Sequence, residues 1–457
     1  MKIDLELLKK YNVSGPRYTS YPPATHFSEE FTAEDYTKEI VKTNNGDNLP
    51  DLSFYLHLPY CDTLCYFCGC NMIVTRNRER IKKYIKYLKN EIELLKRYLL
   101  SDRKVAQLHW GGGTPTHLNP DEIHSLISYI KNSFPFKKDA EISCEIDPRG
   151  LTKDHLVALR SGGFNRISMG VQDFNEKVQR HVNRVQSIEL TKQVIDWVRE
   201  LGFKSINLDL MYGLPFQTVE TFEKTLDIIL AFAPDRLAVF NFAHVPWLKK
   251  HQVLIHPEDL PSAQEKLNIL KMTNEKLSSR GYVFIGMDHF AKPEDELSIA
   301  LRNKKLYRNF QGYSTHAGCD LYAFGITAIS QLKNIYAQNL KNEGDYFNAL
   351  DSGQFPIFKG YRLNRDDEIR RTVIMKLMCN FELTFNEIET MYNINIKEYF
   401  SSAFDKLKIM EDEGLVKIDI EKIKVTEMGR LLIRNIAMNF DKFLENENER
   451  IKYSKAI

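Results

Sequence analysis

The stretch HLPYCDTLCYFCGCN, residues 57–71, holds the most specific pattern in the chain: Cys61, Cys65 and Cys68 at CxxxCxxC spacing, directly after a strand-like apolar run. Three thiolates at this spacing can bind three irons of a [4Fe–4S] cube, whereas full protein ligation takes four. One iron then stays open for chemistry. A fourth thiol, Cys70, follows two residues after Cys68.

Two other uses of clustered cysteines fit this stretch less well. A tetrahedral zinc site normally takes two separated pairs of Cys or His, and no second pair accompanies this one. Disulfides are disfavoured because the seven cysteines are an odd number and four of them lie within ten residues. No apolar targeting segment precedes them in MKIDLELLKKY, so we expect a reducing, cytoplasmic location. Cys144, Cys319 and Cys379 stand alone in apolar or small-residue surroundings and are assigned no chemistry.

Length and charge narrow the class of protein. A chain of 457 residues can form two domains with an additional arm. Its 63 basic and 61 acidic side chains leave a net charge of +2, so no overall field attracts nucleic acid or an anionic membrane. No apolar run reaches eighteen residues, and no membrane span is expected.

Short apolar runs alternate with helical periods from residue 52 onward. Strands are predicted at residues 53–59, 105–110, 141–146, 166–170, 206–210 and 237–242. Helices are predicted over residues 78–100 and from about residues 120, 152, 188, 219 and 262. Six such β/α units predict an α/β fold, an open partial (β/α)6 barrel whose ligands gather at the carboxyl ends of its strands.

The second predicted strand leads into HWGGGTPT, residues 109–116. Three consecutive glycines permit positive φ and a close approach between backbone and ligand. The segment lacks the lysine of a phosphate-binding P-loop and the spacing of GxGxxG. A tight turn with a purely structural role is the alternative.

Four polar residues interrupt or follow later strands: Glu145, Gln172, Arg184 and Asp209. Such groups need partners, because burying an unpaired charge costs several kcal/mol. They are candidates for ligand binding. The alternative is internal pairing of Glu145 or Asp209 with Arg184.

The three-cysteine loop, with aromatic Tyr66 and Phe67 before its last cysteine, resembles the radical S-adenosylmethionine (SAM) superfamily, in which SAM chelates the open iron. The resemblance narrows to the oxygen-independent coproporphyrinogen III oxidases, over nearly the whole chain. It rests on GPRYTSYPPATHF (residues 15–27), HWGGGTPT, SCEIDPR, GFNRISMGVQDFNEKVQRHVNR, LDLMYGLP, FNFAHVPW, NFQGYSTHAGCDLYAFGITAIS and the CxC ending at Cys70. Pro23 departs from the threonine more common there, with little expected consequence.

This resemblance implies roles for particular residues. The cluster would be bound by Cys61, Cys65 and Cys68. The SAM on the open iron would contact Tyr55, Gly112, Glu145 and Ile329. A second SAM bound nearby would contact Phe67, Gly113, Thr114, Gln172, Arg184, Asp209 and Ala243. Catalytic roles are expected for Cys70, Tyr55 and Glu145. Arg17 is a candidate for binding substrate carboxylates, with a solvated arginine as the alternative.

The family's reaction follows from these parts. A reduced donor such as flavodoxin or ferredoxin supplies an electron, SAM is cleaved to a 5′-deoxyadenosyl radical, and hydrogen is abstracted from a propionate β-carbon. Loss of CO2 and an electron leaves a vinyl group, so two rounds convert coproporphyrinogen III to protoporphyrinogen IX in haem biosynthesis. A haem-binding chaperone on the same barrel is the main alternative, and a SAM-cluster methyltransferase or redox protein with another substrate is a weaker one. We expect a monomer.

Four regions are expected. They are an N-terminal arm at residues 1–51 that contributes to the substrate site, the barrel at 52–290, an extension and linker completing the site at 291–363, and a C-terminal domain at 364–457. The last is mainly helical, and its two-strand run and final helix resemble a winged helix. Because its lysines are mixed with acids, we expect a lid over the barrel mouth and no nucleic-acid binding.

Overall fold

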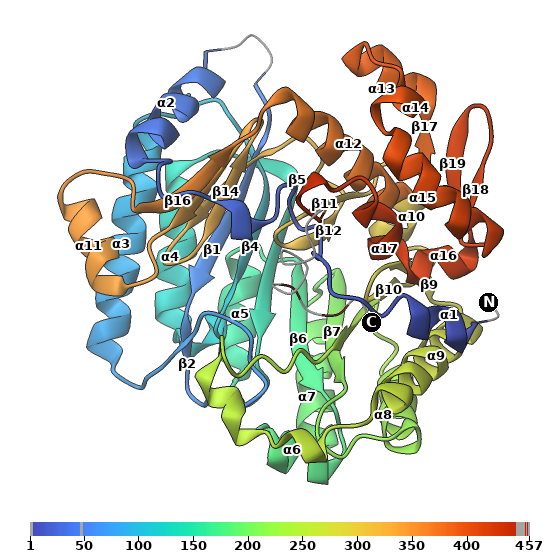
Figure 1. The fold of residues 1–457 in the computed structure, drawn as a ribbon. Coiled ribbons are helices and arrows are strands. Elements are labelled where there is room, and N and C mark those ends of the chain that lie inside the picture. Colours follow the sequence, from blue (N-terminus) through green and yellow to red (C-terminus); the bar gives the residue numbers. More distant parts are fainter. Residues whose placement is uncertain (1–2, 46–48, 445–452, 454, 456–457) are drawn as a thin grey trace.

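The computed structural model describes residues 3–45, 49–444, 453 and 455, and these form a curved twelve-stranded sheet surrounded by helices (Figure 1). The strands follow the order β16-β15-β14-β13-β1-β4-β5-β6-β7-β8-β10-β9. Within the described part of the chain, no helix combines the length and the apolar character needed to cross a membrane.

The six predicted strands are present and lie parallel to their neighbours in chain order. They are β1 (Leu52–Leu58), β4 (Val105–Gly112), β5 (Phe136–Ile146), β6 (Arg166–Gln172), β7 (Ser205–Tyr212) and β8 (Arg236–Asn241). The helices that follow them are α3 (Arg78–Lys96), α4 (Pro120–Ser133), α5 (Lys153–Ser161), α7 (Ile188–Glu200), α8 (Val219–Ala231) and α9 (Ala263–Ser279). The predicted partial (β/α) barrel is confirmed.

The region after the barrel strands extends the same sheet at both edges, which the sequence did not predict. On one edge β13 (Asp320–Phe324) pairs parallel with β1, making a seventh parallel strand. Three antiparallel strands follow it: β14 (Ile329–Leu332), β15 (Ile335–Asn339) and β16 (Ile357–Arg362). On the other edge β8 pairs with β10 (His289–Ala291), and β10 pairs with β9 (Val283–Gly286).

The barrel strands divide sharply between their two faces. In β5, buried Ile142, Cys144 and Ile146 alternate with half-buried Ser143 and Glu145. The same alternation of buried apolar and more accessible polar residues runs through β6 and β7. Successive side chains of a strand point to opposite faces, so one face packs on the helices and the other is polar.

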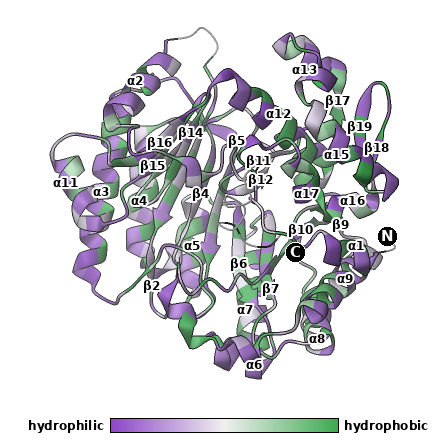
Figure 2. Cartoon of the chain, viewed as in Figure 1, coloured by the Kyte–Doolittle hydropathy of each residue, from purple (hydrophilic) through white to green (hydrophobic). Residues whose placement is uncertain are grey.

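The helices begin where the sequence provides caps, and their buried stripes pack on the apolar face of the sheet. At the start of α4, the Asn119 side chain accepts from the Glu122 N–H and the Glu122 carboxylate accepts from the Asn119 N–H, both at 2.9 Å. Pro120 occupies the first helical position, where no N–H is needed. The surrounding helices carry both hydrophilic and hydrophobic residues (Figure 2).

The C-terminal region forms a second core together with the N-terminal arm. It contains α12 (Arg365–Asn380), α13 (Phe385–Tyr392), α14 (Ile396–Tyr399), α15 (Ser401–Asp412), α16 (Glu427–Leu431) and α17 (Ile433–Met438). Its sheet has three strands, β17 (Glu382–Thr384), β19 (Lys422–Val425) and β18 (Val416–Ile418), where two were predicted; the last helix is divided in two. Tyr18 and Tyr21 of the arm are fully buried in this core.

Remaining elements connect these layers. Two helices of the N-terminal part are α1 (Leu5–Lys10), which packs on α9, and α2 (Ala33–Thr43), which packs on β16. Between barrel and C-terminal region lie α10 (Glu296–Arg302), β11 (Tyr307–Asn309), β12 (Gly312–Ser314) and α11 (Glu343–Asp351). Short α6 (Glu176–His181) follows β6.

A buried ion pair holds the seventh parallel strand. The Arg103 guanidinium donates to Asp320 at 2.7 Å, and both side chains are almost completely buried. Removing one partner of a buried pair leaves an uncompensated charge.

We expect Asp320→Ala to lower the free energy of unfolding by about 3–5 kcal/mol in urea titrations. The matched control is Asp51→Ala, whose partly exposed pair with Lys137 should contribute less than about 1 kcal/mol. Equal effects of the two variants would contradict this role for Arg103.

Candidate functional site

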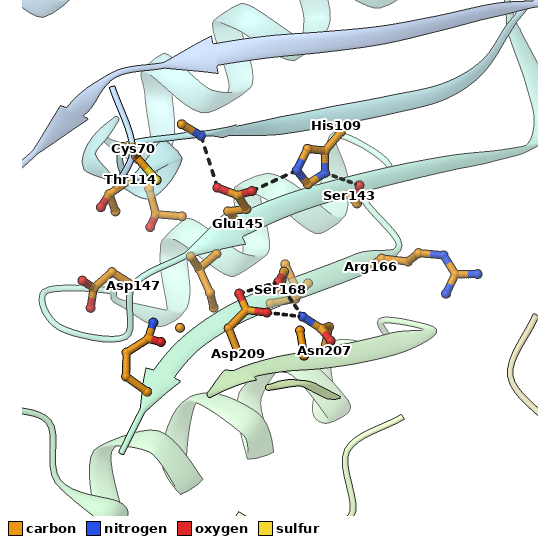
Figure 3. Close-up of a pocket in the computed structure, with 18 of the residues that line it drawn as sticks. Cys70, His109, Thr114, Ser143, Glu145, Asp147, Arg166, Ser168, Asn207 and Asp209 are labelled. Carbon is orange, nitrogen blue, oxygen red and sulfur yellow. Dashed lines mark hydrogen bonds and ion pairs between the residues drawn. The ribbon is translucent and has the colours of Figure 1, made fainter. Parts of the chain in front are cut away.

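A cavity of about 830 Å³ occupies the polar face of the barrel. Its wall includes the cysteine loop (residues 61–70), the glycine loop (residues 111–114) and inward-facing residues of β4 to β8. The close-up in Figure 3 shows Cys70 and Thr114 at one end and Arg166 toward the other, with Glu145 and Asp209 between them.

The cysteine loop brings four thiols to this cavity. Cys61, Cys65, Cys68 and Cys70 all line it, and Cys70 is the most exposed. Burial raises the pKa of Cys61 to about 12, although its sulfur lies 3.4 Å from the Thr114 hydroxyl. Among described residues, no group of three or more His, Cys, Asp or Glu side chains is suited to hold one metal ion. That finding concerns a single ion, whereas in a cube each thiolate binds a different iron.

Two arginines approach the middle cysteine. Arg149 and Arg184 direct guanidinium nitrogens at the Cys65 sulfur, at 3.2 and 3.8 Å. Both also donate to Asp147, at 2.7 and 3.0 Å. Burial alone would raise the pKa of Asp147, but the arginine charges outweigh it and hold that pKa below its usual range. Arg184 thus pairs with Asp147 rather than with Glu145 or Asp209.

The glycine loop packs tightly against the end of β1. A Cβ atom on Gly112, whose φ is 116°, would lie 2.7 Å from the His57 ring. A Cβ on Gly113 would lie 2.5 Å from the Pro59 carbonyl oxygen. Real Cβ atoms do not approach so closely, so both glycines are required by packing within the protein itself. Gly112 and Gly113 therefore have the structural role that the sequence left open as the alternative to ligand binding.

Glu145 is fixed at the cavity wall by two donors. The His109 Nε2 donates to one carboxylate oxygen, and the Gly112 N–H donates to the other, each at 3.2 Å. Burial alone would raise the pKa of Glu145, but these donors lower it on balance. His109 Nδ1 is hydrogen-bonded to the Ser143 hydroxyl at 2.7 Å, which fixes the ring (Figure 3). The result is a carboxylate held ionised, with about two-fifths of its side chain accessible from the cavity.

Asp209 faces the cavity from β7, and no cation in the described part of the chain forms an ion pair with it. The Asn207 amide donates to it at 2.7 Å and the Ser168 hydroxyl at 3.2 Å (Figure 3). Burial, followed by the charge of Glu145, raises the pKa of Asp209 to about 6. The two groups that donate to Asp209, Asn207 and Ser168, are neutral, so the negative charge of this carboxylate stays poorly compensated.

Comparisons with known proteins find family models and relatives that match this chain. The model of the radical SAM superfamily matches residues 55–229, and that of the HemN C-terminal domain matches residues 363–432. The oxygen-independent coproporphyrinogen III oxidase of Synechocystis is 47% identical over 461 residues, covering 100% of this chain and 98% of its own. That of Escherichia coli K12 is 47% identical over 454 residues, covering 99% and 98%.

The chain belongs to the oxygen-independent coproporphyrinogen III oxidase family. A solved structure of the Escherichia coli family member, described as coproporphyrinogen III oxidase (HemN) and a radical SAM enzyme, superposes with a TM-score of 0.91. It is 45% identical and covers 97% of this chain and 100% of its own. The fold and superfamily expected from the cysteine motif are thus confirmed.

Membership of this family implies a [4Fe–4S] cluster and SAM, and the residues present fit both. Three cysteines face one cavity, with two guanidinium groups beside them to offset the negative charge of a thiolate cluster. Two buried polar atoms, Gln172 Oε1 and Arg184 Nε, have no hydrogen-bond partner within the described structure. Unpaired polar atoms of this kind suit a polar ligand.

Most residues that the resemblance nominated come together around the cavity. The twelve that line it are Cys61, Cys65, Phe67, Cys68, Cys70, Gly112, Gly113, Thr114, Glu145, Gln172, Arg184 and Asp209. Their individual roles stay predictions.

Four nominated residues lie outside the cavity lining. Tyr55 donates to His57 at 3.0 Å and stacks on the His109 ring. Ile329 begins β14 and packs against a small cluster around Phe27, and Ala243 is exposed after β8.

The fourth, Arg17, lies near the cavity rim. It forms an ion pair with Asp288, and its guanidinium carbon is 5.9 Å from the ring centre of Phe240, which lines the cavity. It is not merely a solvated arginine. Its contact with substrate stays a prediction.

Sequence reasoning missed several residues that shape the site. His109, Asp147, Arg149, Ser168 and Asn207 all line the cavity and bond to nominated groups. A period of two would have revealed most of them, because polar residues recur at 107 and 109, at 141, 143, 145 and 147, at 166 and 168, and at 205, 207 and 209. Arg149 lies in a loop and carries no such pattern.

The poor compensation of Asp209 predicts a pH-dependent stability. The pKa of Asp209 is close to 3.8 in the unfolded chain and about 6 in the folded protein. Above pH 6 the carboxylate is charged in both states, and this charge is unfavourable only in the folded one, so it lowers the free energy of unfolding. Without cofactors, we expect Asp209→Asn to raise the free energy of unfolding by about 1–2 kcal/mol at pH 8, allowing for cavity water. The gain should shrink as the pH falls through 6 and vanish below 4.

The matched control is Asp147→Asn, because the pKa of Asp147 is lowered by its arginines. The Asp147 carboxylate stabilises the folded state above the pKa that it has in the unfolded chain, and this stabilisation is lost in acid. The Asp147→Asn variant should therefore be less stable than the wild type at pH 8. Urea unfolding at several pH values measures both. A loss of stability in Asp209→Asn at pH 8 would contradict the assignment.

Proposed function

We propose that this chain catalyses the oxygen-independent oxidative decarboxylation of two propionates of coproporphyrinogen III, giving protoporphyrinogen IX in haem biosynthesis. The observation that carries this proposal is the three-cysteine loop facing a cavity that also presents Glu145 and Asp209, in a chain that aligns with the oxidases from end to end. The activity is that of an oxidoreductase of the radical SAM superfamily.

Cys61, Cys65 and Cys68 would hold the cluster, leaving one iron for SAM. When bound, reduced cluster and SAM supply a 5′-deoxyadenosyl radical that can abstract hydrogen from an unactivated carbon. The protein's own part is to position the reactants and exclude water. The arginines at Cys65 would offset the negative charge of the thiolate cluster.

Glu145 is arranged to bind a cationic group. Its two oxygens are oriented by His109 and Gly112, yet the side chain stays accessible from the cavity. A preoriented carboxylate suits the amino group of an amino acid, here that of SAM. Tyr55 would act through the ring of His109, against which it stacks.

A second SAM is proposed at the part of the cavity wall that includes the ends of β6 and β7. Among the described residues, no cation pairs with Asp209, and Gln172 Oε1 and Arg184 Nε have no hydrogen-bond partner. Together they offer an acceptor for a ribose or an ammonium group and a donor for a carboxylate. The backbone of Gly113 and the Thr114 side chain line the same cavity.

The N-terminal arm and the C-terminal region would support the reaction at the barrel. Arg17 would bind a propionate carboxylate, and the C-terminal region would act as a lid over the barrel mouth rather than bind nucleic acid. We propose a cytoplasmic monomer reduced by flavodoxin or ferredoxin. The chaperone alternative would bind haem and leave the propionates intact, and the identity to oxidases over the whole chain favours the enzyme.

Cys65 and Cys70 offer a matched pair of variants within one loop. Cys65→Ala should lose the cluster, because it removes one of three ligands. Cys70→Ser should keep the cluster, since Cys70 lies too near Cys68 to bind another iron of the cube readily. It should lose at least about tenfold in turnover, because Cys70 is expected to have a catalytic role. Iron and sulfide content, the EPR spectrum of the reduced cluster and product formation distinguish the two. Full turnover by Cys70→Ser would return Cys70 to a structural role.

The reaction itself is tested with reduced enzyme, SAM and coproporphyrinogen III under anaerobic conditions. We expect CO2, 5′-deoxyadenosine, a monovinyl tripropionate intermediate and then protoporphyrinogen IX. Deuterium placed at the propionate β-carbons should appear in 5′-deoxyadenosine by mass spectrometry, because that C–H bond must break. Tight haem binding with an unchanged macrocycle, despite an intact reduced cluster that cleaves SAM, would favour the chaperone.

A further inference from the structure

The segment after β8, residues 243–256, carries an exposed apolar patch beside the cysteine loop. Its four large apolar side chains are Trp247, Leu248, Val253 and Leu254, which are 74%, 67%, 62% and 50% exposed. Four such residues within eight positions form the densest group of exposed large apolar side chains in the described chain. Grouped exposed apolar residues mark an interaction site more often than single ones do.

The inner side of this segment is fastened to the cysteine loop. The Gln252 amide donates to the Phe67 carbonyl at 3.0 Å, and the His251 Nε2 donates to the Cys68 carbonyl at 2.8 Å. The Lys249 ammonium donates to the Cys70 carbonyl at 3.0 Å. The patch is therefore separated from the cysteine loop by the thickness of one chain segment.

Apolar packing makes this attachment firm. Phe242, just before the segment, and Ile255, near its end, belong to the same small buried cluster as Cys65 and Phe67. Gln252 is 1% exposed, and its side-chain oxygen accepts from the Val245 N–H at 2.6 Å. The patch is thus the outer side of a well-packed platform.

The four apolar side chains do not line the cavity, so they are not part of the wall around SAM and substrate. Residues 243–256 contain Lys249, Lys250 and three histidines but no Asp or Glu. A face of this kind attracts an acidic partner, with charge guiding the encounter and the apolar side chains supplying contact area.

We propose that residues 243–256 are the docking surface for a small acidic protein that delivers one electron at a time to the cluster. In each encounter the carrier is oxidised by one electron and the cluster is reduced by one. The inference rests on the proposed function only in requiring a reducible cluster. Electron-transfer encounters bury little area, often below about 1,200 Å², which a patch of this size can supply.

The test compares two sources of electrons for the same reconstituted holoenzyme. One is flavodoxin kept reduced by its reductase, and the other is dithionite, which is small and needs no docking surface. Cluster reduction is followed by the loss of visible absorbance in a stopped-flow instrument without coproporphyrinogen III. This measurement does not depend on whether the macrocycle is the substrate.

We expect Trp247→Ala and Lys250→Glu each to raise the flavodoxin concentration for half-maximal cluster reduction by about tenfold. Reduction by dithionite should match the wild type. The effect of Lys250→Glu should diminish at high salt, because screening removes its charge contribution. Ile420→Ala and Lys417→Glu, which change an exposed apolar and an exposed basic residue near the β18–β19 turn, are the matched controls and should behave as the wild type.

Two outcomes would overturn the proposal. If flavodoxin reduces the variants as readily as the wild type, the patch is not its docking surface. If dithionite-driven reduction falls by the same factor, the segment acts by holding the cysteine loop. Failure of the proposed function would look different, because the donor-specific effect would persist while coproporphyrinogen III stayed unconverted.

Discussion

The two-residue pleat of the parallel strands is the constraint on which the rest of this molecule depends. Apolar positions such as Ile142 and Cys144 must face the helices, so their neighbours Ser143 and Glu145 must face inward. Because neighbouring strands are in parallel register, these inward positions lie side by side and form one polar wall. The same alternation that builds the hydrophobic core therefore builds the cavity.

Much of the fold could be predicted from the sequence because each barrel strand is a compact apolar run followed by a helix with a regular stripe. The edge strands could not. β9, β10 and β14 contain only three or four residues each, and β13 follows the short β11–β12 pair rather than a helix of a β/α unit. Strands so short carry too few alternations to be recognised, and their pairing is determined by the strand they join.

Site residues could be predicted where the chemistry requires a rare sequence pattern. They could not be predicted where a residue matters only through a contact with another residue far away in the sequence. The spacing of Cys61, Cys65 and Cys68 identified the loop, but nothing in the sequence associated Asp147 with Arg184, thirty-seven positions away. Ala243 and Ile329 carry no polar side chain, so only family resemblance nominated them. Gln172 adopts a φ of 72°, a left-handed conformation that the strand pattern does not reveal.

The burial of the N-terminal arm against the C-terminal core has a consequence for biosynthesis. The Arg434 side chain donates to the carbonyl oxygens of Gly15 and Pro16, and the Tyr18 hydroxyl donates to Asp441 at 2.9 Å. Residues 15–18 thus find these partners only after residues 434–441, more than 400 positions later, have been made. Tyr18 and Tyr21, which are buried in this core, therefore stay uncovered during synthesis even after the barrel is complete, and their burial must follow synthesis of the C-terminal core.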